Sequence, residues 1–244
     1  SDDGTCVLFG HCEEDLATPY QLFAEALGHF VTHATDEQLL EHVEAHGSEL
    51  ARLVPTLAAR IPPSVRFGAS SWNYPGWRGL VYRRTYEGKG ASARMLEEYS
   101  AFPLFRTVGI DSRFYAPPDE AVLRSYAEHL PAGFPCVSKV WNQITVQTFS
   151  KAHDKSRGGQ VNPDFLSAGL FREAVYEPYF QHFTDHSGPF VFEFQTIAGR
   201  SGVTPESFAG RLDEFFGALP VEGMYAVELR NEEFLTPMYF AVLR

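Results

Sequence analysis

Basic residues, cysteines and long apolar runs are all scarce in this chain of 244 residues. Its 20 lysines and arginines stand against 31 acidic residues, and the formal net charge of −11 argues against nucleic acid as a partner, which requires a basic surface. Three cysteines are too few for a disulfide framework, so we expect a reducing, cytoplasmic environment. No run reaches the ~18 apolar residues of a membrane-spanning helix, and the acidic start Ser1–Gly4 is unlike a signal peptide. We therefore expect a globular protein with neither nucleic acid nor membrane as partner, and its oligomeric state stays open.

Two parts of the chain differ in charge and in aromatic content. Residues 1–64 contain two basic residues, Arg52 and Arg60, and 11 acidic ones, so this part carries −9 of the total charge of −11. Only 4 of the 35 aromatic residues lie in it. A change of this size, beside the Ile61-Pro62-Pro63 sequence, predicts a boundary between two segments, 1–64 and 65–244.

The first segment is predicted to be mostly helical. The apolar run 5–10 is typical of a short strand, and apolar residues spaced three and four apart within 19–61 predict about three amphipathic helices. Three pairs of histidines are spaced by four residues, as on one side of a helix: His29/His33, His42/His46 and His182/His186. A metal site needs further ligands, and none stands out beside these pairs. We therefore expect surface histidines, and neither a metal ion nor another cofactor.

Two runs in this segment are distinctive: VLFGHCEEDLATPYQLFAEALGHFV and GSELARLVPTLAARIP. They resemble part of the ATPase module of large bacterial transcriptional regulators and signalling cyclases. The phosphate-binding loop of that module, G-x-x-x-x-G-K-[ST], does not occur in the chain. Backbone amides that cradle phosphates and a hydroxyl for magnesium are therefore missing, and no ATPase activity is predicted.

From residue 65 the pattern changes to strands that alternate with helices. The predicted strands are 65–68, 105–111, 134–141, 190–195 and 224–230. Thr204-Pro205 and Thr236-Pro237 are typical helix starts, and the polar residues 150–162 are expected to form an exposed loop. Such alternation implies a parallel sheet with right-handed crossovers, either an open doubly wound sheet or a (β/α)8 barrel.

Five motifs follow one another in residues 65–244: VRFGASSWNYPGWRGLVY, TVGIDSRFYAPP, FPCVSKVWNQIT, GPFVFEFQ and MYAVELRNEEFLTP. In order and spacing they resemble the domain of unknown function 72 family, the YecE-like proteins. The resemblance implies an α/β, TIM-barrel-like fold of bacterial or archaeal type, with no established activity. A complete barrel takes about 250 residues and eight strands, whereas this segment has 180 residues and about five predicted strands. We therefore expect an incomplete barrel joined to an unrelated fragment of a regulator ATPase.

Polar and aromatic side chains follow the predicted strands of this segment. Ligands of parallel α/β sheets meet the carboxyl ends of the strands, so these side chains are expected to converge at one rim. The candidate catalytic residues are Asp111, Lys139 and Glu228. The carboxylates are suited to general acid–base work, and Lys139 to binding an anionic or carbonyl group. The candidate ligand-binding residues are Trp72, Tyr74, Trp77, Tyr115, Trp141, Gln195 and Arg230. Their rings are suited to stack on a sugar or a base, and Arg230 to pair with an anion.

Each candidate also has a structural interpretation. Asp111 can cap the turn after it, Lys139 and Glu228 can form a buried ion pair, and the Trp/Tyr loop can plug the end of the barrel. Cys136 lies in an apolar run, which favours an inert thiol. We predict a protein that binds or transforms a small polar or anionic ligand at the strand ends. Two alternatives stay open: a non-enzymatic binding or regulatory protein, and a truncated composite without activity of its own.

Overall fold

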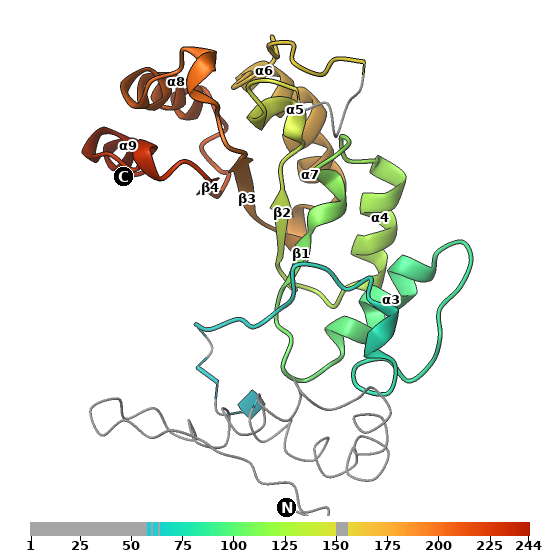
Figure 1. Ribbon diagram of the computed structural model, residues 1–244. Helices are drawn as coiled ribbons and strands as arrows, with labels where there is room; N and C mark the ends of the chain where they lie inside the picture. The colour runs from blue at the N-terminus through green and yellow to red at the C-terminus, as the bar shows by residue number, and fades with distance from the viewer. Residues whose placement is uncertain (1–57, 60, 63, 150–155) are drawn as a thin grey trace, which may run out of the picture. The chain divides into compact units, whose positions relative to one another are not determined.

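Four parallel strands form one open sheet in the computed structural model, which describes residues 58–59, 61–62, 64–149 and 156–244. The strands are β1 (Val108–Ile110), β2 (Cys136–Lys139), β3 (Ser187–Phe194) and β4 (Tyr225–Leu229). They are neighbours in the order β1-β2-β3-β4 (Figure 1). The parallel α/β sheet predicted from the alternating pattern is therefore confirmed, with four strands in place of about five.

Helices connect each strand to the next. After η1 (Pro75–Trp77), α3 (Ala91–Ser100) precedes β1, while η2 (Asp111–Arg113) and α4 (Glu120–His129) lead to β2. The longer connection to β3 contains α5 (Asn142–Thr145), α6 (Ala168–Phe171), the π-helical η3 (Arg172–Tyr176), α7 (Glu177–His182) and η4 (Thr184–His186). Then η5 (Gly199–Ser201) and α8 (Pro205–Gly217) lead to β4, and η6 (Glu232–Phe234) and α9 (Pro237–Val242) follow it.

The two helix starts predicted from Thr-Pro pairs are confirmed. The Thr204 side chain accepts a hydrogen bond from the Ser207 amide and forms a capping box at the start of α8. The Thr236 side chain accepts one from the Tyr239 amide at the start of α9. In both helices proline follows the cap, where its missing N–H costs no hydrogen bond.

The core lies on one face of the sheet. Phe190, Phe192 and Phe194 of β3 alternate toward this face and are buried. Rings from two helices cover them: the Tyr179 ring of α7 lies 5.2 Å from that of Phe190, and the Phe215 ring of α8 lies 5.2 Å from that of Phe192. Burial of this aromatic layer is the main driving force for packing α7 and α8 on the sheet.

The opposite face of the sheet carries small, half-buried residues in its middle, Gly109, Val137, Val191 and Ala226, and charged residues at its carboxyl end. Large aromatic residues on one face and small residues on the other explain why the strands read as nearly continuous apolar runs without clear alternation. Cys136 belongs to the helix-covered face, where burial raises the pKa of its thiol to about 12. An inert thiol, as predicted, is the consequence.

The first predicted strand, 65–68, is not formed as a strand. Only an isolated bridge joins Phe67 to Phe105, with the Arg106 amide donating to the Phe67 carbonyl (2.8 Å). The Gly109 amide still donates to the Ala69 carbonyl (2.8 Å), but the Ala69 amide donates to the hydroxyl of Tyr99 in α3 (2.7 Å), so no regular ladder forms. A side chain at Gly109 would come within 2.6 Å of the Ser70 carbonyl oxygen, so glycine is what lets this segment run close to β1.

The loop predicted as exposed, 150–162, ends in a buried residue. Asn162 is 3% exposed and donates to the carbonyl oxygens of Gln143 (2.6 Å) and Val146 (2.7 Å). The Gln143 amide in turn donates to Asp164 (2.8 Å). Residues 156–161 are exposed, apart from the half-buried Gly158, so the prediction is confirmed for them and wrong only at Asn162, which these side-chain hydrogen bonds hold in the interior.

Several predictions concern residues outside the described part of the chain. These are the strand at 5–10, the helices within 19–57, the first two histidine pairs and residues 150–155 of the loop. The boundary near residue 64 stays a prediction. Among the helices that the structure describes, none combines the length and the apolarity needed to cross a membrane.

Candidate functional site

Charged side chains from neighbouring strands meet at the carboxyl end of the sheet. Lys139 pairs in register with Val191, and Glu228 pairs with Glu193. Because side chains alternate along a strand, Val191 and Glu193 lie on the same face, and Lys139 and Glu228 share it. This is the face opposite to the aromatic core. The predicted convergence at one rim is therefore seen for these side chains.

Four of the charges form a closed ring of ion pairs. Lys139 Nζ lies 2.6 Å from Glu193 Oε2 and 3.8 Å from Glu228 Oε2. Arg230 Nη2 lies 3.3 Å from Glu193 Oε1 and 2.6 Å from Glu228 Oε1. Each cation thus bridges both carboxylates, and each carboxylate offers one oxygen to each cation. The four residues, called the ion-pair ring below, carry no net charge together.

Glu193 is the member of the ring that sequence reasoning missed. It is 8% exposed, whereas the side chains of Lys139 and Arg230 are 25% and 54% exposed. The signal was present in the sequence: a single carboxylate stands between Phe192 and Phe194 in an otherwise apolar run. A charge in a buried strand requires a partner, because the cost of leaving it unpaired exceeds most single contributions to stability.

Asp111 adds a fifth charge beside the ring. It begins η2 directly after β1 and is partly buried. Burial raises the pKa of its carboxyl group; the positive charge of Lys139 opposes this shift, and the charges of Glu193 and Glu228 add to it. For Lys139, burial by itself lowers the pKa, but the hydrogen bond to Glu193 and the charges of the three carboxylates outweigh burial and raise it. Lys139 is therefore held more firmly in its charged form, and the Asp111 carboxyl group is protonated more easily than an exposed aspartate.

Two of the predicted ligand-binding rings are packed into the protein. Trp72 is 2% exposed, and its indole N–H donates to the Ser92 carbonyl in α3 (2.8 Å). The Trp77 ring stacks on Tyr99 of α3 at 6.2 Å between centroids. The indole group of Trp72 thus has its hydrogen bond satisfied and no free face to offer. Trp77 packs against the core, so both rings have a structural role, while the plug interpretation stays a prediction because the sheet that the structure describes is open and not a closed barrel.

The remaining candidates differ in position. Tyr74 is 56% exposed and lies edge-on to Trp77. Tyr115 is 65% exposed and packs against Phe114, whose ring centroid is 6.0 Å from Lys139 Nζ. Trp141 and Gln195 are half-buried and follow β2 and β3 at the same end of the sheet as the ion-pair ring. Tyr115, Trp141 and Gln195 thus stay candidates near the charges, and Tyr74 lies with the aromatic loop.

No metal site emerges among the residues that the structure describes, where no group of three His, Cys, Asp or Glu side chains is placed to hold an ion. The prediction of surface histidines is wrong for the third pair, because His182 is half-buried and His186 is 6% exposed, and the two have separate partners. His182 Nε2 lies 3.2 Å from a Glu120 carboxylate oxygen, and His186 Nδ1 lies 3.0 Å from the Phe134 carbonyl oxygen.

A model of a protein family, described as protein of unknown function DUF72, matches residues 66–244. The chain belongs to the DUF72 family. Residues 1–64 lie outside this match, and their resemblance to an ATPase module is not supported. A comparison with curated proteins gives no match.

Solved structures of DUF72 family proteins are similar to the chain. One from Thermotoga maritima MSB8 is 19% identical with a TM-score of 0.47, over 73% of this chain and 60% of that one. Another, from Enterococcus faecalis V583, is 19% identical with a TM-score of 0.43, over 73% of this chain and 57% of that one. The chain thus spans less than two thirds of the length of these relatives.

The strand ends of the DUF72 chain combine fixed cations with a carboxyl group of raised pKa. Lys139 and Arg230 can donate hydrogen bonds to oxygens of a bound molecule, since ammonium and guanidinium groups have more donors than the ring uses. Asp111 can accept or release a proton close to them. The arrangement has the elements of acid–base chemistry on an oxygen-bearing molecule.

Asp111→Asn is expected to stabilise the DUF72 chain at pH 7. A carboxyl group whose pKa is raised by folding stabilises the folded state only when it is protonated. The contribution of Asp111 to the free energy of unfolding is therefore fully present below its ordinary pKa of 3.8, and it is lost as the pH rises through the raised pKa of the folded state. The amide is neutral at every pH and avoids this loss. Urea unfolding between pH 3 and 7 should show the variant's advantage at pH 7 shrinking toward zero in acid.

The control for this prediction is Asp185→Asn, at an exposed aspartate in η4. Its effect on the free energy of unfolding should show no such gain toward pH 7. If Asp111→Asn instead destabilises the chain at pH 7, attraction by Lys139 dominates at this position and the raised pKa of Asp111 is wrong.

Proposed function

We propose that the ion-pair ring and Asp111 form the binding site for a small polar molecule that carries hydroxyl, carbonyl or carboxylate oxygens. The observation that supports this most is the ion-pair ring itself, which holds Lys139 and Arg230 at the carboxyl ends of β2 and β4, the two strands on either side of β3. Ligands of α/β sheets bind at that end of the strands. Side chains on strands, locked by mutual ion pairs, are also preorganised in the way that a binding site requires.

In the proposed site each residue has a separate role. Lys139 and Arg230 donate hydrogen bonds to ligand oxygens and stabilise negative charge that develops on them. Asp111 transfers a proton to or from the ligand, for which its raised pKa is suited. Glu193 positions both cations and, because it is buried, does not itself touch the ligand. A bound molecule that is also transformed would undergo acid–base chemistry.

The charge balance narrows the ligand class. With Asp111 ionised, the five residues carry one net negative charge, so a dianionic phosphate ester is disfavoured. A neutral polyol or a monocarboxylate is the better fit. The hydroxyl groups of a polyol can donate hydrogen bonds to the carboxylates of the protein, and the single carboxylate of a monocarboxylate ligand needs to displace only one glutamate from the cations. Glu228 is the one to move, since its side chain is 38% exposed and that of Glu193 only 10%.

We also propose that the open sheet is part of a TIM-barrel-like (β/α) structure. Strands in the order β1-β2-β3-β4 with right-handed crossovers place all connecting helices on one face. A doubly wound sheet needs a reversal of strand order, which the four strands in the described part of the chain lack. The small residues on the free face are suited to line the interior of a barrel, which would need further strands to close.

One observation favours a second candidate, a structural role without ligand. Every cation of the ring already contacts two carboxylates within 4 Å. Buried ion pairs of this kind can fix the register of strands without any part in binding. A non-enzymatic protein would then use the cluster only to hold β2, β3 and β4 together.

A ligand screen with the full chain separates the two roles. Thermal unfolding would be followed with neutral sugars, carboxylates, sugar phosphates and nucleotides. A ligand present at a hundred times its Kd stabilises the folded state by about 2.7 kcal/mol, a shift of several degrees. We expect stabilisation by a polyol or a carboxylate, and loss of that stabilisation in Lys139→Ala and Arg230→Ala.

Lys89→Ala is the matched control, because Lys89 is an exposed cation in the loop before α3. It should respond to ligand as the unsubstituted chain does. Indifference to every ligand class, or stabilisation that persists in both Lys139→Ala and Arg230→Ala, contradicts the proposed site and supports the structural role.

A further inference from the structure

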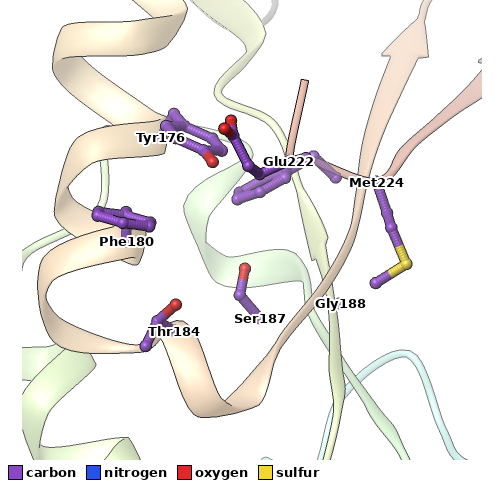
Figure 2. A pocket seen from close by; sticks show the side chains of 9 residues that line it. Tyr176, Phe180, Thr184, Ser187, Gly188, Glu222 and Met224 are labelled. Carbon is purple, nitrogen blue, oxygen red and sulfur yellow. The ribbon is translucent and has the colours of Figure 1, made fainter. Parts of the chain in front are cut away.

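A pocket lies at the end of the sheet opposite to the ion-pair ring. Its floor comes from the starts of β3 and β4, at Ser187, Gly188 and Met224, and its wall from η3 and α7 (Figure 2). Its volume is about 140 Å³. This is well below the ~300 Å³ at which sites for drug-sized molecules begin, so any ligand must be small.

Two aromatic rings form the wall of this pocket. Tyr176 and Phe180 are four residues apart on consecutive helical turns, and their rings stack at 6.0 Å between centroids with 14° between planes. The Tyr176 ring also packs against Phe190 of the core, which fixes the pair. Phe180 is 58% exposed. A phenyl ring held rigid by stacking and still open to solvent presents a ready surface for a ligand.

A carboxylate completes the pocket. Figure 2 shows the side chain of Glu222 beside the ring of Tyr176. Burial is the larger cause of the raised pKa of Tyr176, and the charge of Glu222 adds to it, in agreement with this proximity. Among the residues that the structure describes, 58–59, 61–62, 64–149 and 156–244, no ion pair or hydrogen bond engages the Glu222 carboxylate.

The pocket has no positive charge of its own. None of its lining residues is Lys, Arg or His. Burial raises the pKa of the neighbouring Tyr225, the charge of Glu222 adds to this shift, and the positive charge of Arg172 opposes it. Its guanidinium donates to the Ala218 carbonyl (3.3 Å) and does not line the pocket. An unneutralised carboxylate beside two aromatic rings has the chemistry of a cation site, since ring faces and carboxylates both attract ammonium groups.

We propose that this pocket binds a small organic ammonium ion, with Tyr176, Phe180 and Glu222 as its principal contacts. The ring faces take the methyl or methylene groups of the ammonium head, and Glu222 neutralises its charge. Met224 supplies further apolar surface on the opposite side (Figure 2). The proposal is independent of the site at the carboxyl ends of the strands, because the two sites lie at opposite ends of the sheet.

Choline is a suitable probe, with dimethylbutanol as its uncharged isostere in which carbon replaces the ammonium nitrogen. Binding to the full chain would be measured by NMR titration or calorimetry. We expect choline to bind with Kd on the order of a millimolar, and the isostere about tenfold more weakly, because cation–π and ion-pair attraction act only on the charged probe.

Two variants test the contacts. Glu222→Gln should weaken choline binding about fivefold or more and leave the isostere unaffected. Phe180→Leu keeps apolar bulk but removes the ring, and should weaken choline about threefold. Glu177→Gln is the matched control, an exposed carboxylate on α7 that does not line the pocket, and should change nothing. Since Glu222 and Phe180 are exposed, both test variants should unfold at the temperature of the unsubstituted chain.

Three results would overturn the proposal: equal affinity for choline and its isostere, an unchanged affinity in Glu222→Gln, or no binding of choline at about ten times the expected Kd. Lys139→Ala separates the two sites. It should abolish ligand stabilisation at the strand ends and leave choline binding intact, so failure at either site can be recognised.

Discussion

Glu193→Ala is expected to lower the free energy of unfolding by about 3 kcal/mol, the low end of the cost of breaking a buried ion pair. Glu193 is the least exposed member of the ion-pair ring and accepts hydrogen bonds from Lys139 (2.6 Å) and Arg230 (3.3 Å). Its loss leaves two cations with one carboxylate between them. The cost stays at the low end because the Arg230 side chain is more than half exposed, so water can replace the hydrogen bond that it loses.

Glu228→Ala is the matched comparison, because it removes the same group from the same two cations. Glu228 is more exposed than Glu193, so we expect a cost of about 0.5 to 1 kcal/mol, as for a surface ion pair. Both values follow from urea unfolding at pH 7. If the two substitutions lower the free energy of unfolding equally, burial does not determine how much each carboxylate of the ion-pair ring contributes. The central role assigned to Glu193 is then wrong.

Phe192→Ala is expected to cost about 4 kcal/mol, within the range for truncating a fully buried phenylalanine. The ring is completely buried in β3 and lies 5.2 Å from the rings of both Phe171 and Phe215. The substitution removes the layer on which α6 and α8 pack. A cost of this size is a large part of the stability of a domain, so the transition in urea should shift strongly or lose cooperativity.

The control is the same substitution at Phe180, whose ring is 58% exposed. Phe180→Ala should change the free energy of unfolding by less than about 0.5 kcal/mol, the usual limit for surface positions. Phe192→Leu should lie in between, because it refills much of the cavity. A small effect of Phe192→Ala would mean that the aromatic layer can collapse around the gap and is not the core that its burial indicates.

The substitutions at Phe192 and Glu193 act on opposite faces of β3. The aromatic face of β3 holds the helices, and the charged face presents the ion-pair ring. Loss of Phe192 should therefore weaken the whole fold, and loss of Glu193 should also disturb the positions of Lys139 and Arg230. Ligand binding by a Glu193→Gln variant that remains folded would separate positioning from stability.

Much of the site was predictable because strand ends can be read from local patterns. Asp111, Lys139, Glu228 and Arg230 were identified as polar residues that close or follow apolar runs, and the ion pairs join the last three. The predicted Lys139–Glu228 pair is present, but at 3.8 Å it is weaker than the Lys139–Glu193 pair at 2.6 Å. Glu193 was not predicted as a site residue, because a strand rich in phenylalanine suggests burial on both faces.

The aromatic loop shows where local reading fails. A tryptophan after a strand has the same sequence pattern whether it faces a ligand or the core. Trp72 is buried because Ser92, twenty residues later, accepts its indole hydrogen bond and Tyr126 packs edge-on at 4.9 Å. The strand predicted at 65–68 fails for a similar reason, since the hydroxyl of Tyr99 takes the amide of Ala69 that pairing would need.

Local chemistry was enough to establish the class of fold, the helix starts at Thr204 and Thr236 and the general position of the charges, because apolar periodicity and capping act over a few residues. Contacts between distant segments settled which charges meet and which rings are buried. Lys139 and Glu193 are 54 residues apart, and only the register of β2 against β3 brings them together. That register depends on packing of the aromatic face, which no short stretch of the chain encodes.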